Sequence, residues 1–182
     1  MQRSIVSFKN NDWIFNPQDN LENKVVYNNK SNIYDLHRFL VRSGDQEIEF
    51  YGTVNDTVSK SVHFDFKDVQ LANITPNIDS LHLSGLVNGS LDYDQLYQQL
   101  KPSANLSVSD FYINNSDQGN LRIDIAGKNS FKNYDLDIQL NRDGIPSLSA
   151  VGELDFSGAE PTMDVNLNFE AFKLDAFSPL GE

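Results

Sequence analysis

Apolar and polar residues alternate along much of this chain, which is the pattern of strands with one buried and one solvent-facing side. The segment YDLDIQLNRDGIPSLSAVGELDF (134–156) holds two such runs on either side of Asp143-Gly144. The apolar positions of the first run are Tyr134, Leu136, Ile138 and Leu140. Those of the second are Leu148, Ala150, Gly152, Leu154 and Phe156. The segment is therefore predicted to be two strands that share an apolar face.

The same period-two alternation recurs from residue 48 to residue 169. Its other members are Ile48, Phe50, Gly52, Val54, Val62, Phe64, Phe66, Leu81, Leu83, Gly85, Leu106, Val108, Leu121, Ile123, Ile125, Met163, Val165, Leu167 and Phe169. The phase slips at Asp68, after which Val69 and Leu71 continue the pattern, and it slips again near Phe111. One extra residue in a strand has this effect, so a β-bulge is predicted at each slip.

Turn signals separate these runs. Asp143-Gly144 and Asn88-Gly89 are dipeptides typical of two-residue hairpins, and both are predicted to be turns. A polar loop is predicted at NNSDQGN (114–120). A helix competes with a strand only in LDYDQLYQQLKP (91–102), where apolar side chains recur four residues apart and Pro102 would end the helix.

The composition supports an all-β chain and limits the classes of partner that it is expected to bind. The 182 residues include 21 Asn, and Asp outnumbers Glu by 19 to 7, which suits turns better than helix interiors. The net charge of -12 argues against nucleic acid and against docking on an anionic membrane surface. There is no cysteine, so thiol chemistry, cysteine metal sites and disulfides are excluded.

The sequence predicts about a dozen strands that share one apolar face. It predicts almost no helix, so something other than helices must cover that face. Two sheets can pack face to face in a β-sandwich, which the alternation taken alone favours. Alternatively, one sheet can curl into a trough whose apolar inside holds a nonprotein ligand. The alternation fits both architectures, and it favours the sandwich without deciding between the two.

Candidate catalytic or metal-binding chemistry is sparse. His37, His63 and His82 lie far apart in the sequence and are predicted to be solvent-facing strand residues. The acidic pairs Asp92/Asp94 and Asp135/Asp137 have strand spacing on a polar face, without the Gly and Glu of a calcium loop. No phosphate loop, zinc-protease helix or nucleophile elbow is present. We therefore expect no enzyme, no cofactor and no metal.

The chain shows no internal domain boundary, linker or low-complexity tract. It also has no run of 18 apolar residues and no signal-peptide core at MQRSIVSFKNNDW. The last residues, FEAFKLDAFSPLGE, follow directly on a patterned stretch without a polar tail. Residues 1–182 are therefore interpreted as a single β-rich repeat segment of a longer chain.

From residue 46 onward, the order of motifs resembles the TamB family, the AsmA-like inner-membrane subunits of the translocation and assembly module. The stretches that carry the resemblance are QEIEFYGTVND, LHLSGLVNGSLDY, KPSANLSVSDFYINNSDQGNLRIDIAG and IPSLSAVGELDFSGAEPTMDVNLNFEAFKLDAFSPL. Each motif is common among β-repeats, and it is their order that is specific. The membrane anchor and the C-terminal region of such proteins have no counterpart in these residues, as expected of a middle fragment.

The resemblance implies an elongated, curled β-sheet with an apolar groove, in a bridge-like lipid-transfer protein of the periplasm that is anchored to the inner membrane. It implies that phospholipid acyl chains occupy the groove on their way towards the outer membrane, and that a BamA-like barrel partner engages regions outside this fragment. The residues predicted to line the groove are Phe50, Phe64, Phe66, Leu83, Leu106, Val108, Leu121, Ile123, Ile125, Tyr134, Leu136, Ile138, Leu140, Leu154, Phe156, Val165, Leu167 and Phe169.

Two alternatives remain open at this point. One is a structural or adhesive β-sandwich that binds protein or sugar through its surface loops. The other keeps the family but uses the groove as a chaperone edge, adding strands of unfolded outer-membrane proteins by β-augmentation.

Overall fold

The computed structural model describes residues 3–9, 11–55, 58–75, 81–97, 99–128, 132–158 and 160–174. Its strands are β1 (Ser4–Phe8), β2 (Asn11–Phe15), β3 (Val25–Asn28), β4 (Ile33–Ser43), β5 (Gln46–Asn55), β6 (Ser59–Gln70), β7 (Leu83–Leu96), β8 (Gln99–Ile113), β9 (Ser116–Gly127), β10 (Asn133–Arg142), β11 (Ile145–Asp155) and β12 (Thr162–Phe169). One short helix, α1 (Leu71–Ile74), lies between β6 and β7.

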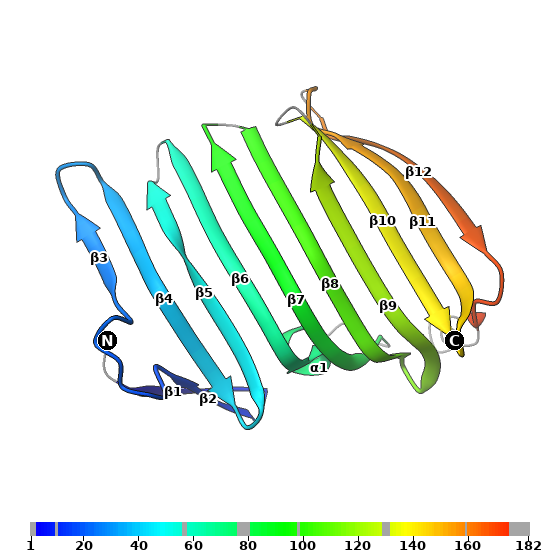
Figure 1. The fold of residues 1–182 in the computed structure, drawn as a ribbon, viewed down its shortest axis with the longest axis horizontal. Coiled ribbons are helices and arrows are strands. Elements are labelled where there is room, and N and C mark those ends of the chain that lie inside the picture. The colour runs from blue at the N-terminus through cyan, green and yellow to red at the C-terminus, as the bar shows by residue number, and fades with distance from the viewer. Residues whose placement is uncertain are drawn as a thin grey trace.

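All twelve strands belong to one antiparallel sheet in the order β1-β2-β4-β5-β6-β7-β8-β9-β10-β11-β12, with β3 paired to β4. Figure 1 shows β3 to β12 side by side in chain order, so that the sheet is elongated, while β1 and β2 run across its lower end beside β4 and β5. The all-β, curled-sheet prediction is confirmed. The described strands form one sheet, and the two-sheet sandwich is therefore wrong.

The register places the apolar positions of neighbouring strands opposite one another. One row of directly paired residues crosses the sheet with one residue from each strand from β5 to β12. These residues are Phe50, Phe64, Leu91, Ala104, Ile125, Leu136, Gly152 and Val165. Directly paired residues in a sheet project to the same side. The alternation of each strand therefore adds up to one continuous apolar face, which we call the inner face, and one polar outer face.

Bulges bend the strands near the end of the sheet where α1 lies. The register shifts between Phe66 and Val69 and between Val108 and Phe111, which confirms the two bulges predicted from the slips in phase. Asp68 and Asp110 adopt positive φ angles of 52° and 49° at these bulges. Bulges increase local twist and bend a strand, which helps a long sheet to curl.

The predicted turns had different outcomes. Asp143-Gly144 does connect β10 to β11, with φ of 53° and 77°, as a type I′ turn requires. Asn88-Gly89 is not a turn but lies inside β7, and that prediction was wrong. The Asn88 side chain instead accepts a hydrogen bond from the Asp68 N–H at 3.0 Å, which satisfies the backbone of the β6 bulge.

The structure also decides one segment that the sequence left open, and it corrects two further predictions. Residues 91–102 form the end of β7 and the start of β8, paired from Leu96↔Gln99 to Tyr93↔Pro102, so no helix forms there. The strand predicted to continue through Leu71 stops at Gln70, where α1 begins. The polar loop is shorter than predicted, because β9 already starts at Ser116. Residues 175–182 lie outside the described residues.

The protein-packed core is concentrated at the bulged end. Trp13, Val41, Val69, Val87, Val108, Phe111, Ile113 and Leu140 form one buried cluster there. The β1–β2 hairpin lies at this end of the sheet, as Figure 1 shows, and β2 pairs with β4 over only two residues. The fold therefore covers one end of the inner face with its own chain.

Candidate functional site: the inner face of the sheet

The candidate site is the apolar inner face. Of the eighteen residues predicted to line a groove, sixteen lie in its paired rows between β5 and β12. The other two are Leu83, which pairs with Ile113 beyond the bulge and packs against the buried cluster, and Phe156, which follows the end of β11. The Phe156 ring meets the Tyr134 ring edge-on, with centroids 5.5 Å apart.

The predicted lining residues differ in how far their side chains are buried by the protein. Val108, Leu136, Leu140 and Tyr134 are buried, so part of the predicted stripe is ordinary core. Most of the others, including Phe50, Phe64 and Ile138, are half-buried. On β12, Leu167 is 60% exposed and Phe169 is 56% exposed. The uncovered part of the inner face thus extends from the middle strands to the β12 edge.

Aromatic side chains form a continuous floor at the β4–β6 end of the face. The Phe39 and Phe50 rings stack with centroids 5.1 Å apart, and Phe50 and Phe64 are 5.9 Å apart. Phe66 extends the row, 6.4 Å from Phe64. Offset aromatic contacts of this kind contribute about 1 kcal/mol each beyond area burial, so they hold this part of the face rigid.

The β1–β2 hairpin and α1 lie over this floor and enclose an open apolar pocket of about 330 Å³. We call it the hairpin pocket. Its lining residues are Val6, Phe8, Trp13, Phe15, Val41, Ile48, Phe50, Phe64, Asn73 and Ile74. The hairpin residues and Val41 were not predicted to line the groove, although Val6/Phe8 and Trp13/Phe15 carry the same period-two signal.

Polar contacts fasten the hairpin to α1. The Lys9 ammonium donates to the Ala72 carbonyl at 3.0 Å and also to the Thr75 carbonyl. The Asn11 amide donates to Asn73 Oδ1 at 3.0 Å, and Asn73 in turn donates to Gln46 Oε1 at 3.1 Å. The bonds of Lys9 and Asn11 join segments more than 60 residues apart and hold the pocket's two walls together.

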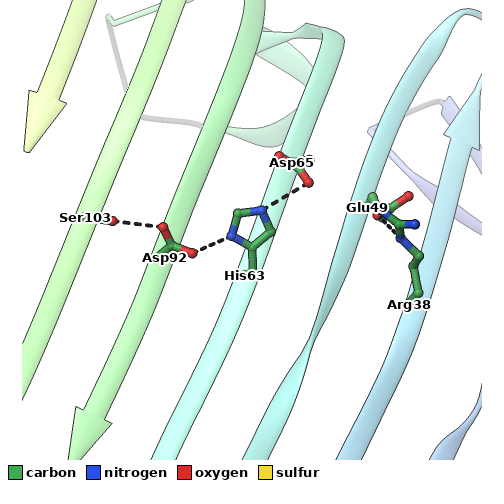
Figure 2. A network of polar contacts seen from close by, with 6 residues as sticks. All are labelled: Arg38, Glu49, His63, Asp65, Asp92 and Ser103. Carbon is green, nitrogen blue, oxygen red and sulfur yellow. Dashed lines mark hydrogen bonds and ion pairs between the residues drawn. The ribbon is translucent and has the colours of Figure 1, made fainter.

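The outer face is polar and carries a charge network across β6, β7 and β8, shown in Figure 2. His63 Nδ1 contacts Asp92, and His63 Nε2 lies 3.1 Å from Asp65 Oδ2. Ser103 Oγ donates to the other oxygen of Asp92 at 2.9 Å. His63 is on the polar side as predicted, but the sequence did not reveal that two carboxylates flank it.

The surroundings of His63 shift its pKa. Burial alone would lower the pKa, but the hydrogen bond that His63 donates to Asp92 and the charges of Asp65 and Asp92 outweigh it and raise the pKa above 6.5. Asp92 is partly desolvated, which opposes ionisation, yet its bonds to His63 and Ser103 lower its pKa. Both shifts favour the charged pair, and the contacts of Asp92 with His63 and Ser103 tie three strands together from outside.

This raised pKa predicts a pH-dependent contribution to stability. A histidine whose folded pKa exceeds its unfolded value stabilises the protein fully below the unfolded pKa, and this stabilisation is lost as the pH rises through the folded value. His63→Gln should therefore lower the free energy of unfolding by roughly 1 kcal/mol at about pH 5.5, with the partly exposed carboxylates limiting the effect. The loss should largely vanish by about pH 9.

Urea unfolding of both proteins at the two pH values measures this difference. In an Asp92→Asn background, the pH dependence of the His63→Gln effect should shrink, because the main partner of His63 is gone. A loss of stability that is the same at both pH values and in both backgrounds would mean that His63 contributes only packing.

Among the described residues, no group of three or more His, Cys, Asp or Glu side chains is positioned to hold a metal ion. Within the same residues, no helix is long and apolar enough to cross a membrane. The feature that remains for function is a long open sheet with one apolar face.

Comparison with protein-family models, curated proteins and solved structures returns no match. The fold and the chemistry of the inner face are therefore the basis for assigning a function.

Proposed function

We propose that this chain is a non-enzymatic segment of a lipid conduit, in which the inner face carries phospholipid acyl chains. The observation behind the proposal is the in-register apolar face from β5 to β12, much of which is only half-buried by protein. A folded chain does not leave so much contiguous apolar surface to water without a partner. Acyl chains match such a face because they need no hydrogen bond from it.

The mechanism is physical. Each methylene group that leaves water gains about 0.8 kcal/mol, so a chain of a dozen carbons gains of the order of 10 kcal/mol. The half-buried lining is built mainly of Leu, Ile, Val and Phe, which gives no single deep site. A lipid would therefore slide along the face while its headgroup stays in water at the open rim.

The resemblance to TamB-like chains gives the proposal its cellular setting. In that setting, the segment belongs to a longer periplasmic chain anchored in the inner membrane, and lipid moves towards the outer membrane. Assistance to a BamA-like barrel in placing outer-membrane proteins would involve regions outside this fragment. The polar outer face, rich in Asp and Asn, suits a sheet that must stay soluble along its length.

Native mass spectrometry of the purified protein, with lipid extraction, tests the proposal. We expect phospholipid to copurify, or to transfer to the protein from phosphatidylethanolamine/phosphatidylglycerol vesicles, on a particle that scattering shows to be elongated. A chain that stays lipid-free under both conditions would overturn the conduit. The bound lipid should be displaced by other acyl lipids, since the described lining of the face is mainly apolar and would contact the acyl chains.

One observation favours a second function for the same sheet. Among the described strands, β12 pairs only with β11, and its inner-face side chains Met163, Leu167 and Phe169 are exposed. An unpaired edge of this kind is a template for an added strand. Strand addition by unfolded outer-membrane proteins predicts binding of extended peptides that depends on the β12 backbone more than on the inner-face side chains.

A further inference from the structure

The hairpin pocket differs from the rest of the inner face because protein walls it on two sides. The hairpin contributes Val6 and Trp13, the sheet contributes Ile48 and Phe50, and α1 contributes Ile74. Trp13 is only 6% exposed. Since Ile48 and Phe50 also belong to the inner face, the pocket opens directly onto the proposed groove.

The pocket offers nothing to a charged group. Among the described residues that line it, none is charged, and the one polar residue, Asn73, already bonds to Asn11 and Gln46. The nearby Lys9 ammonium is held by two carbonyls at α1. A pocket with apolar walls and satisfied polar groups favours apolar ligands over charged ones.

The volume of the pocket sets the size of what it holds. At roughly 30 Å³ for a water-sized group, about 330 Å³ accommodates on the order of ten such groups. A membrane-lipid acyl chain is longer than this, so its remaining carbons must lie outside the pocket on the inner face. Its polar head would then lie farther away still.

We propose that the hairpin pocket is a binding site for the methyl end of one acyl chain, which enters from the inner face and ends against Trp13. The site rests on the proposed conduit function and adds to it a fixed end position and a direction for the bound chain. A lipid reaching this end of the sheet would be held by the hairpin instead of sliding past it.

Trp13 is the chain's only tryptophan, so its fluorescence reports directly on the pocket. The experiment titrates the whole protein with stearic acid carrying a nitroxide quencher, below the micelle concentration of the probe. A label near the methyl end should quench Trp13 about twofold more than a label near the carboxyl group. Equal quenching by the two probes, or none, would overturn the proposal.

Two neighbouring residues of β1 give a matched pair of variants. Val6 lines the pocket and is 50% exposed, whereas the adjacent Ile5 is 60% exposed and does not line it. Val6→Asp should weaken probe binding about tenfold, because it places a carboxylate in an apolar site, and Ile5→Asp should leave binding unchanged. Equal weakening by both would contradict the site.

The quenching and mass-spectrometry results together test the pocket proposal separately from the conduit proposal. If native mass spectrometry finds bound phospholipid while neither probe quenches Trp13, the pocket proposal fails and the conduit stands. If neither phospholipid nor probe binds, both fail. The two label positions are compared in the unaltered protein, so the test does not depend on whether a variant folds.

Discussion

Gly89→Ala is expected to destabilise the protein by about 3–4 kcal/mol, although the change adds a single methyl group. Gly89 lies in the middle of β7 on the inner face, between Phe66 of β6 and Leu106 of β8. Its φ of 120° is a backbone conformation that residues with a side chain rarely adopt. A Cβ atom there would lie 2.0 Å from the Asn105 carbonyl oxygen of β8.

The clash is costly because both partners are backbone. Asn105 pairs with Ser90 in the β7–β8 ladder, and β8 is paired to β9 on its other side, so β8 cannot move away alone. Relief would require several strands to separate near the buried cluster. The close approach explains why a glycine is needed here at all.

Gly44→Ala is the matched control for this variant. Gly44 also has a positive φ, 60°, but it lies in the turn between β4 and β5, with nothing within 4 Å of an added Cβ. Gly44→Ala should lower the free energy of unfolding by about 1 kcal/mol, because only the backbone conformation at this position is unfavourable for alanine. Urea unfolding followed by circular dichroism compares the two. Equal losses would mean that the sheet relaxes around residue 89 without strain.

The same position shows why sequence reasoning misread this part of β7. Asn88-Gly89 has the composition of a hairpin turn, yet each residue is needed for a contact with a neighbouring strand. Asn88 bonds to the β6 bulge at Asp68, and Gly89 lets the β8 backbone approach. Local propensity cannot reveal contacts to strands that lie about 20 residues away in the sequence.

The strands and their faces were predictable for a different reason. Period-two alternation is imposed by the sheet itself, because a slip of one residue would turn every apolar side chain to the wrong side. The positions where the phase changes, Asp68 and the neighbourhood of Phe111, are therefore where the register shifts. Alternation does not say what covers the apolar face, which is why the sandwich stayed open until the strand order was known.

The sequence alone could not predict that the chain covers one end of the inner face. The contact of Lys9 with Ala72 and Thr75 joins residues more than 60 positions apart, and four residues of α1 are too few for a helical period. Burial is equally hard to predict: Leu140 is 2% exposed and Leu167 is 60% exposed, although both occupy the same alternating pattern. Tertiary neighbours decide this difference.

Charged substitutions on the open part of the inner face should strongly reduce lipid capture. Ile138 of β10 and Leu167 of β12 flank Ala150 of β11 in one row across three strands. Leu167→Asp places a carboxylate where an acyl chain would lie and should reduce crosslinking of a phospholipid with a photoreactive acyl chain by about tenfold. Ile138→Asp should act in the same way and also destabilise the fold, because Ile138 is half-buried.

Asn166→Asp is the control that isolates the role of the face. It adds the same negative charge one position from Leu167, on the outer side of the same exposed strand. Because its side chain points away from the proposed path, crosslinking should remain near that of the unaltered protein. If Leu167→Asp keeps full crosslinking while still folded, acyl chains do not pass over β12. If both variants lose crosslinking equally, net charge near the edge controls capture and the inner face does not.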